Sequence, residues 1–407
     1  MLNLSERRRI LFIGEAVTLA HIARPVVLAR SLDPQRYAVT LACDDRYHHL
    51  FAEIPFEWRS IRTIPSAQFL AALAKGSPVY DTDTLRSYVR EELKIIESVK
   101  PDLVVGDFRI SLAVSTRLVG VPYFTITNAY WSPYSKLSFP LPEHPMTKVL
   151  GVPLSQILFR LARPLAFAYH TLPLNRVRCE YGLSSLSYDL REIYTHADHT
   201  LYADIPGLVP TRPLPSNHHW LGPILWSPTV KFPDWWSKLP EDRPIVYVTL
   251  GSSGAGEMLP VVLQALEKLQ VTVIVATAGR PAPANPPANA WITEFLPGTE
   301  AAIRSSLVIC NGGSPTTQQA LSAGVPVIGI ASNMDQHLNM FCLERASVGV
   351  GLRSGQVIPR RVRDLVKQLL SDVWYRQAAD RLRGTIEGWD AGRVFAGQVA
   401  AQLKLNC

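Results

Sequence analysis

The chain has 407 residues, 47% of them hydrophobic and 18% charged, and its formal net charge is +7. A chain of this length exceeds one ordinary hydrophobic core, so we expect two folded domains. The positive charge suits anionic ligands or an acidic membrane surface. Basic runs are short and aromatic residues do not interleave with them, so we expect no nucleic-acid partner.

The cysteines and the apolar segments indicate a cytosolic location. Five cysteines, an odd number, lie far apart in the sequence, which fits neither a disulfide framework nor a zinc site. Gly14 and Glu15 interrupt the apolar segment that follows Arg9, so we interpret this segment as a first strand rather than a signal peptide. The sequence also lacks the run of about 18 apolar residues that a membrane-spanning helix requires.

Strand and helix patterns alternate along the first half of the chain. Expected strands are residues 10–13, 37–42, 103–105 and a run from Pro122, and expected helices are residues 19–32 and a segment that ends at Gly120. This alternation predicts a parallel sheet with helices on its faces.

The same alternation restarts in the second half, with strand 245–250, helix 259–269 and strand 271–277. The Pro- and Trp-rich segment 208–244 lies before it and is interpreted as a connector. The sequence therefore predicts an α/β protein with two doubly wound, Rossmann-like domains.

Three segments follow from this division of the chain. Residues 1–222 form the first domain and residues 223–385 the second, with the boundary at Gly222-Pro223. Residues 386–407 have a helical pattern weakened by glycines, and we expect them to cross back to the first domain.

The most informative motif is a glycine turn in the second half. Residues 307–310 end a strand, Gly312 and Gly313 let the backbone approach a ligand, and Ser314 with Pro315 occupy the N-cap and first position of a helix. Free amides at such a helix start attract an anion. A second strand follows that helix and ends just before Asp335 and Gln336, at the sheet edge where ligands of α/β proteins bind.

These residues resemble an inverting nucleotide-sugar glycosyltransferase of the GT-B fold, in the superfamily of UDP-glucuronosyltransferases and macrolide glycosyltransferases. Residues 311–336 are similar to that family's H-G-G-x-x-[ST]-x-x-E signature with its D-Q pair. Residues 246–253 are similar to its V-Y-V-x-x-G-S segment, and residues 221–224 to its G-P linker. The resemblance implies two domains facing a central cleft, the first binding the acceptor and the second the donor.

The resemblance also implies a donor site in the second domain. In that family the turn binds the diphosphate, the D-Q pair binds sugar hydroxyls, and an aromatic residue stacks on the base. Carried over, these roles fall on Ser252, Ser253, Phe295, Leu296, Asn311, Gly312, Gly313, Ser314, Thr316, Gln319, Asp335 and Gln336.

Three positions depart from the family pattern. Asn311 replaces a histidine, and a neutral hydrogen bond contributes about 1 kcal/mol against roughly 1.5 to 3 for a charged one, so another cation would have to compensate. Gln319 replaces the ribose-binding Glu and Gly298 replaces a Gln, so a TDP-sugar stays open beside a UDP-sugar.

His21 is the candidate catalytic base, because it stands in a segment similar to the family's base-carrying H-x-x-P, with Arg24 at the proline position. Imidazole titrates near the pH at which an acceptor hydroxyl must lose its proton. Asp107, at the end of a later strand, resembles the residue that orients this histidine. Glu15, on the same loop as His21, is a rival base.

The acceptor side carries the least specific signals. Tyr130, Trp131 and Tyr134 follow a strand end and are the candidate acceptor-binding residues. The apolar segment 152–174, with Arg160 and Arg163, is interpreted either as a core helix, the commoner case, or as a surface that meets a membrane or lipid. No metal motif is suitably placed, and we expect neither a metal nor a bound cofactor.

The sequence thus predicts an enzyme, a metal-independent hexosyltransferase. It would move a sugar from a UDP- or TDP-sugar to a hydroxyl of a hydrophobic, aromatic or lipid-like acceptor, with inversion and with His21 and Asp107 as the catalytic pair. Alternatives are a sugar-nucleotide epimerase of GT-B architecture and a non-catalytic accessory protein. Peripheral contact at the inner membrane surface is left open.

Overall fold

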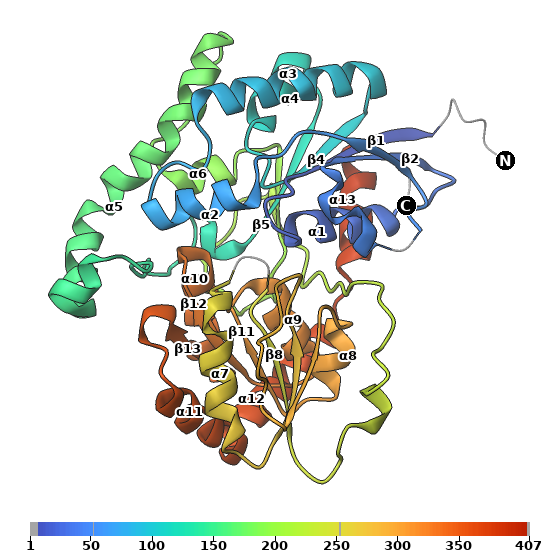
Figure 1. Ribbon diagram of the computed structural model, residues 1–407. Coiled ribbons are helices and arrows are strands. Elements are labelled where there is room, and N and C mark those ends of the chain that lie inside the picture. The colour runs from blue at the N-terminus through green and yellow to red at the C-terminus, as the bar shows by residue number, and fades with distance from the viewer. Residues whose placement is uncertain (1–6, 52, 252–253, 405–407) are drawn as a thin grey trace. The chain divides into compact units, whose positions relative to one another are not determined.

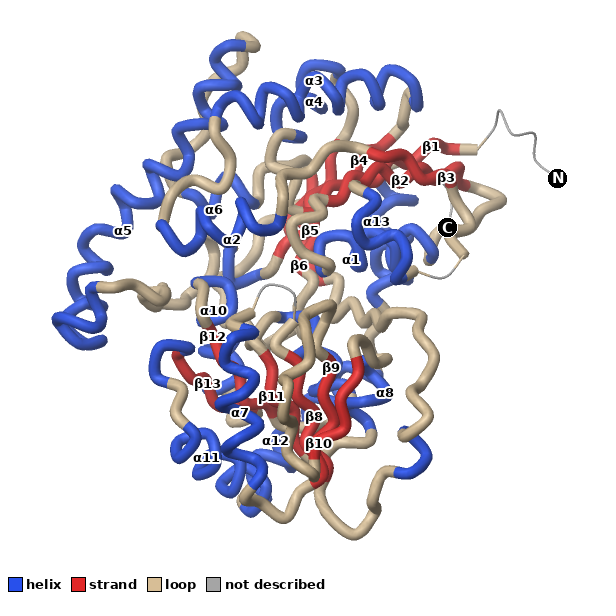
Figure 2. The backbone as a smooth tube through the Cα atoms, viewed as in Figure 1, coloured by secondary structure: helices blue, strands red, loops and turns tan. Residues whose placement is uncertain are grey.

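The computed structural model describes residues 7–51, 53–251 and 254–404, and within these the chain forms two compact units. Unit 1 contains the described residues of segments 1–137, 157–224 and 390–407, and unit 2 contains those of 138–156 and 225–389. Each unit is built around its own parallel sheet with helices on both faces (Figures 1 and 2).

Unit 1 has a seven-stranded parallel sheet in the order β3-β2-β1-β4-β5-β6-β7. Its strands are β1 (Arg8–Gly14), β2 (Tyr37–Cys43), β3 (Glu57–Ser60), β4 (Leu103–Asp107), β5 (Tyr123–Thr127), β6 (His199–Tyr202) and β7 (His218–Trp220). Its helices are α1 (Ala20–Arg30), α2 (Ser66–Lys75), α3 (Thr82–Val99), α4 (Leu112–Val119), α6 (Leu190–Tyr194), α13 (Ala391–Gln402) and most of α5 (Met146–Glu180).

Unit 2 has a six-stranded parallel sheet in the order β10-β9-β8-β11-β12-β13. Its strands are β8 (Ile245–Thr249), β9 (Thr272–Ala276), β10 (Ala290–Thr293), β11 (Leu307–Cys310), β12 (Val327–Ala331) and β13 (Gly349–Arg353). Its helices are α7 (Leu259–Glu267), α8 (Gly298–Ile303), α9 (Ser314–Ser322), α10 (Met334–Arg345), α11 (Pro359–Ser371) and α12 (Val373–Glu387).

Both sheets reverse their strand order at one place, between β1 and β4 in unit 1 and between β8 and β11 in unit 2. The strands there are continuous apolar runs, because helices cover them on both faces, and β4, β8 and β11 are buried along their whole length. In doubly wound proteins ligands bind beyond the carboxyl ends of the strands at such a reversal. We therefore expect the functional site in the loops after β1, β4, β8 and β11.

The chain crosses between the units more often than the sequence-based division into 1–222, 223–385 and 386–407 provides for. Residues 138–156 belong to unit 2, where the Arg353 guanidinium donates to the carbonyls of Leu141 and Pro142, both at 2.9 Å. Hydrogen bonds between residues more than 200 positions apart leave no local sequence pattern. The sequence alone therefore does not show that residues 138–156 belong to unit 2. Residues 390–404 lie in unit 1, where Phe395 of α13 packs on Phe12 of β1.

Two local expectations differ from the structure. The N-cap of α9 is Gly313 rather than Ser314, because the helix begins one residue earlier than the Ser-Pro pattern indicates. Within the segment interpreted as a connector, His218 and His219 lie on the edge strand β7, where Tyr202 and His199 contact them at 2.6 and 2.8 Å.

Among the residues described, no helix combines the length and apolarity needed to cross a bilayer.

Two half-buried histidines of unit 1 make its stability depend on pH. Burial, followed by nearby positive charge, lowers the pKa of His196 from 6.5 to about 4, and burial with two neighbouring histidines lowers the pKa of His218 to about 4. Below pH 6.5 the unfolded chain binds protons that the folded chain does not bind until about pH 4. The contribution of these two histidines to stability is therefore fully present above pH 6.5 and is lost as the pH drops toward 4.

We expect the free energy of unfolding, measured in urea, to fall by about 1 kcal/mol per histidine between pH 7 and pH 5, after allowance for solvent screening. His196→Asn should flatten this dependence, because it removes one of the histidines whose pKa is lowered in the folded chain. His49→Asn, at an exposed histidine, is the matched control and should leave the slope unchanged. Equal slopes for wild type and His196→Asn would contradict the assignment.

Candidate functional site

His21 and Asp107 lie side by side at the strand reversal of unit 1. Gly14 of β1 pairs with Asp107 of β4, and α1, which carries His21, begins six residues after β1 ends. His21 Nδ1 lies 2.8 Å from Asp107 Oδ1, with the His21 side chain 18% exposed and Asp107 fully buried. The structure thus brings together the two residues proposed as a catalytic pair, 86 positions apart in the chain.

Arg24 holds the same carboxylate from the other side. Its Nε donates to Asp107 Oδ2 at 2.8 Å and one terminal nitrogen donates to Oδ1 at 2.7 Å, while the other donates to Asn128 Oδ1 at 2.9 Å. Burial alone would raise the pKa of Asp107, but the charges of Arg24 and His21 and their hydrogen bonds lower it below its ordinary value. Asp107 is therefore an ionised, fully buried acceptor.

The Asp107 carboxylate decides which nitrogen of His21 carries the proton. The Arg24 guanidinium also lies 3.0 Å from His21 Nδ1, where it could donate only to an unprotonated nitrogen, but the same guanidinium nitrogen already donates to Asp107 Oδ1 at 2.7 Å. A proton on Nδ1 satisfies Asp107, whereas an unprotonated Nδ1 would place a lone pair against it. The favoured tautomer donates from Nδ1 to Asp107 and leaves Nε2 free to accept a proton.

Phe108 connects this pair to a row of aromatic rings. Its φ of +57° lies in the left-handed region, which a bulky residue seldom adopts and which turns its ring onto His21 at a centroid distance of 4.7 Å. Tyr194 follows at 5.6 Å from Phe108, and Trp131 lies edge-on to Tyr194 at 5.2 Å. Trp131 therefore belongs to the surroundings of His21.

The other two candidate acceptor residues are placed differently. Tyr130 is completely buried, so its side chain is not open to a ligand. Tyr134 stacks edge-on against His218, at 5.3 Å, away from the aromatic row. Sequence reasoning missed Phe108, which stacks on His21, and Tyr194, which contacts Phe108, because no motif in the sequence marks them.

Glu15, the rival base, is occupied by other partners. Both carboxylate oxygens are fully buried, with Arg109 donating at 2.7 Å and the Tyr88 hydroxyl at 3.0 Å. Burial raises the pKa of Glu15, and the nearby Arg109 charge only partly offsets it. Glu15 is thus part of a buried polar cluster with Arg109 and Glu92, which Arg109 also contacts at 2.7 Å.

The glycine turn of unit 2 follows β11 and leads into α9, as the motif predicts. Gly312 has a φ of +77°, which an L-residue with a side chain would adopt only with strain. Asn339 of α10 donates to the Gly312 carbonyl at 2.8 Å and to the Thr317 hydroxyl at 2.9 Å, so the turn is fixed from behind. Ser314 is buried and Thr316 is half-buried in the first turn of α9.

Asn311 faces the loop that follows β8. Its Oδ1 accepts from the Gly313 amide at 3.1 Å, and a Cβ on Gly254 would lie only 2.6 Å from the Asn311 Cβ. Arg280, after β9, donates to the Gly254 carbonyl at 2.8 Å. The structure therefore places a guanidinium on the loop that Asn311 touches. Ser252 and Ser253, two candidate donor residues on this loop, lie outside the described residues.

Gln319 and Gly298, two of the departures from the family pattern, are in direct contact. The Gln319 amide donates to the Trp226 carbonyl at 2.5 Å, and a Cβ on Gly298 would lie 2.6 Å from the Gln319 side-chain oxygen. Phe295 is half-buried beside Gly279, whereas the Leu296 side chain is buried and leaves only its backbone for a ligand. The two substitutions therefore form one packing unit.

Asp335 and Gln336 lie in the first turn of α10, just beyond β12. Gln336 Oε1 accepts from the Ser332 amide at 2.9 Å, and Asp335 is half-buried. Glu143, from the 138–156 segment, lies nearby: its amide donates to the Ser332 carbonyl at 3.4 Å, and Arg353 holds its carboxylate at 2.9 Å. Sequence reasoning missed Glu143, because its partners Ser332 and Arg353 are far away in the sequence.

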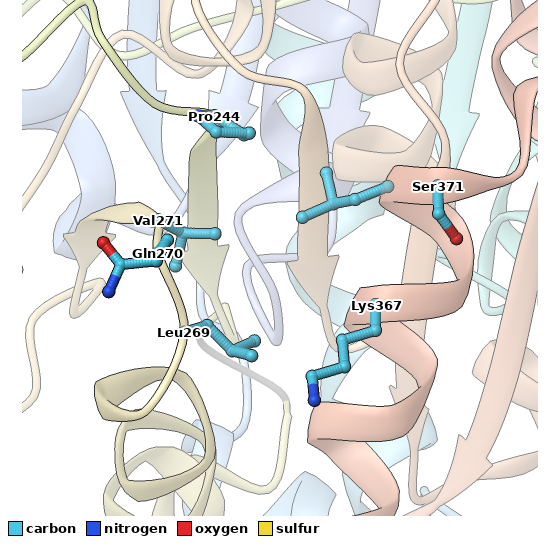
Figure 3. Close-up of a pocket in the computed structure, with 7 residues that line it drawn as sticks. Pro244, Leu269, Gln270, Val271, Lys367 and Ser371 are labelled. Carbon is cyan, nitrogen blue, oxygen red and sulfur yellow. The ribbon is translucent and has the colours of Figure 1, made fainter.

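A cavity of about 350 Å³ lies at the opposite edge of the unit 2 sheet (Figure 3). Pro244 and Val271, which line it, precede β8 and β9. It is thus at the amino ends of the strands, away from the glycine turn and from the edge at which such folds bind ligands.

Solved structures share this architecture. The spinosyn rhamnosyltransferase SpnG complexed with thymidine diphosphate superposes with a TM-score of 0.68 over 96% of this chain and 99% of its own, at 18% identity. Two doubly wound units of this strand order, matching such structures, define the GT-B fold of glycosyltransferases.

Sequence relatives identify the family within that fold. The PGL/p-HBAD biosynthesis glycosyltransferase of Mycobacterium tuberculosis (strain ATCC 25177 / H37Ra) is 56% identical over 403 residues, which is 99% of this chain and 94% of the relative. The PGL/p-HBAD biosynthesis rhamnosyltransferase of Mycobacterium bovis (strain BCG / Pasteur 1173P2) is 56% identical over 378 residues, 93% of this chain and 84% of the relative. Residues 260–388 match the erythromycin biosynthesis protein CIII-like C-terminal domain. The chain belongs to this family of nucleotide-sugar glycosyltransferases.

The Arg24–Asp107 contact gives a prediction about stability. Arg24→Met leaves a buried carboxylate with one partner fewer, so we expect the free energy of unfolding to fall by about 3–5 kcal/mol. Arg8→Met removes the partly exposed Arg8–Asp102 pair and should cost about 1 kcal/mol or less. In Arg24→Met/Asp107→Asn, the loss should be smaller than the sum of the single losses. Urea unfolding of these three variants and of Asp107→Asn measures the losses; similar losses for Arg24→Met and Arg8→Met would contradict the proposed role.

Proposed function

We propose that the protein catalyses inverting transfer of a sugar from a nucleotide diphosphate to a hydroxyl group of a hydrophobic, aromatic or lipid-like acceptor, with His21 as the base and Asp107 as its partner. The observation that carries this proposal is the contact between His21 Nδ1 and the fully buried Asp107 carboxylate at the strand reversal of unit 1. A base held by a buried carboxylate is the arrangement that proton transfer requires.

The proposed reaction is a single displacement. His21 Nε2 takes the proton of the acceptor hydroxyl as that oxygen forms a bond to the anomeric carbon. The bond between this carbon and the diphosphate oxygen breaks, and the nucleoside diphosphate leaves with the electron pair. Asp107 stabilises the imidazolium that forms, and attack from the face opposite the leaving group inverts the centre.

A TDP-activated deoxysugar, such as rhamnose, is the donor we favour. One relative bears the name of a rhamnosyltransferase, and one structural neighbour is a rhamnosyltransferase complexed with thymidine diphosphate. Gln319 is neutral, so it lacks the negative charge that favours binding of a ribose diol. Its amide already donates to the Trp226 carbonyl. A neutral side chain that is already hydrogen-bonded suits a deoxyribose. The charged Glu that the family pattern has at this position suits a ribose with its paired hydroxyls.

The diphosphate would lie at the glycine turn, with Arg280 supplying the positive charge that Asn311 lacks. The N-terminus of α9 offers backbone amides beside Gly313, and Arg280 lies on the loop that Asn311 contacts. A guanidinium suits phosphate because its planar donors match the phosphate oxygens. These groups can stabilise the leaving diphosphate without a metal ion, so the proposal requires none.

The aromatic row of Phe108, Tyr194 and Trp131 supports an aromatic or lipid-like acceptor. These rings extend from His21, so a flat apolar group packed on them would bring its hydroxyl to the base. The names of the relatives place those proteins in PGL/p-HBAD biosynthesis, and we propose an acceptor of that pathway here. Peripheral contact with a membrane completes the proposal, because a lipid-like acceptor would be met there.

Replacement of His21 tests the base. His21→Ala should lower kcat for transfer about 100- to 10,000-fold, because the acceptor hydroxyl loses its proton acceptor. The thermal shift that TDP produces should stay unchanged, since the proposed nucleotide site is in unit 2. His49→Ala, at an exposed histidine, should behave as wild type in both assays. Transfer that persists at the wild-type rate in His21→Ala would refute the mechanism.

Replacement of Arg280 tests the diphosphate site. Arg280→Gln should raise the KM for the donor about tenfold or more, since a charged hydrogen bond to phosphate contributes about 1.5–3 kcal/mol. Arg243→Gln, which removes an exposed arginine of the same unit, is the matched control. Steady-state kinetics with varied donor measure the effect. A donor KM unchanged in Arg280→Gln would place the diphosphate elsewhere.

A further inference from the structure

Helix α5 exposes a long apolar face along unit 1. Ile157, Leu161 and Leu165 are 59%, 74% and 77% exposed, and Tyr169 and Leu172 continue the series at 52% and 47%. These five residues recur every three or four positions, so they lie on one side of the helix. We call them the outer face of α5. Figure 1 shows this part of α5, in green, along the outside of unit 1.

The opposite side of the same helix is fixed to unit 1. Phe167, Thr171 and Leu174 are buried there. Arg178 donates to the carbonyls of Ser184, at 2.8 Å, and Ala113, and Glu180 pairs with Arg86 of α3 at 2.9 Å. The helix is therefore anchored by one side, and the interpretation of segment 152–174 as a core helix applies to that side alone.

Exposed leucines in such a row are costly in water and indicate a partner. A scattered apolar residue on a protein surface needs no explanation, but a contiguous apolar patch marks an interaction site. Each large side chain that leaves water on docking contributes favourably. The partner must therefore present an apolar layer that accepts one side of a helix lying along it.

The charges on α5 indicate what else the partner presents. From residue 144 to residue 179 the sequence has no Asp or Glu, whereas Lys148, Arg160, Arg163 and Arg176 are all basic. Arg160 and Arg176 are exposed, and Arg163 lies over the Phe167 ring at 5.7 Å. A partner that fits this helix therefore combines apolar groups with negative charge.

We propose that the outer face of α5 docks on an anionic lipid surface, with the helix parallel to the membrane plane. Leucines and Tyr169 would enter the boundary of headgroups and acyl chains, and the arginines beside them would contact lipid phosphates. A second copy of this chain fits less well, because pairing two such faces would bring Arg160 and Arg176 of one copy against those of the other, and residues 144–179 supply no carboxylate to pair with them. The inference concerns location, not chemistry: it names the surface for the peripheral membrane contact that is part of the proposed function, and its test does not depend on the identity of the donor.

Vesicle co-sedimentation of the full chain tests the proposal. We expect binding to vesicles of phosphatidylglycerol and phosphatidylcholine in equal parts at low salt, and much weaker binding to phosphatidylcholine alone. Leu161→Gln/Leu165→Gln should bind about tenfold more weakly, because two apolar side chains no longer enter the lipid. Arg160→Gln should weaken binding about fivefold, the loss expected for one basic residue at such a surface.

Matched controls separate docking from folding and from catalysis. Ile303→Gln/Val373→Gln changes two apolar residues of unit 2 that are 66% and 62% exposed, and it should bind vesicles as wild type does. Both double variants should melt at the wild-type temperature and transfer sugar to a water-soluble phenolic acceptor at the wild-type rate. Lost vesicle binding with retained transfer would thus support docking independently of the reaction.

Two results would overturn the proposal. One is absence of wild-type binding to the anionic vesicles at low salt. The other is binding that Leu161→Gln/Leu165→Gln retains in full, which would place any lipid contact elsewhere. Light scattering distinguishes the competing occupant: a wild-type dimer that becomes monomeric in this variant, with no vesicle binding, would show that the outer face of α5 joins two copies of the chain.

Discussion

The charge of the buried Asp107 carboxylate is the constraint on which the site of unit 1 depends. A carboxylate without water is costly unless cations and donors surround it, and here Arg24 and His21 supply both. Arg24 is itself buried and is held by Asn128, which donates to Asp204 at 2.8 Å. The orientation of His21 thus depends on a buried polar network that joins the ends of β1, β4, β5 and β6. The substitution of Arg24 for the proline of the family pattern is therefore a change in how the base is supported, since the proline could not pair with a carboxylate.

The parts of the fold that sequence could predict are those set by local physics. Continuous apolar runs fixed the central strands, and adjacent glycines marked the turn after β11, where Gly312 has a positive φ. His21 and Asp107 could also be predicted as neighbours, because both follow strands that a doubly wound order brings together. The short edge strands β7 and β10 were missed, since three or four residues with polar or half-buried side chains carry no clear period.

What could not be predicted depends on contacts between distant residues. Arg353 reaches the carbonyl groups of residues 141 and 142 across more than 200 positions, and Phe108 gains its place beside His21 only through a strained backbone. Helix α5 gives a related case. Its periodicity shows that one side is apolar, but not whether a protein core covers that side. In the structure the side with Phe167 is buried, and the side with Leu161 is exposed to solvent.

The departures from the family pattern are best understood as sets of contacts rather than as single losses. Gln319 occupies the space beside Gly298, so a side chain at 298 and the present position of Gln319 exclude each other. Asn311 is confined by the glycines after β8, and Arg280, which follows the neighbouring strand β9, places its guanidinium on this loop. A positive charge near a phosphate acts through space, so the residue that supplies it need not occupy the same position in the sequence. A site can therefore keep its electrostatic character while individual motif residues change, provided that the fold brings a substitute to the same edge of the sheet.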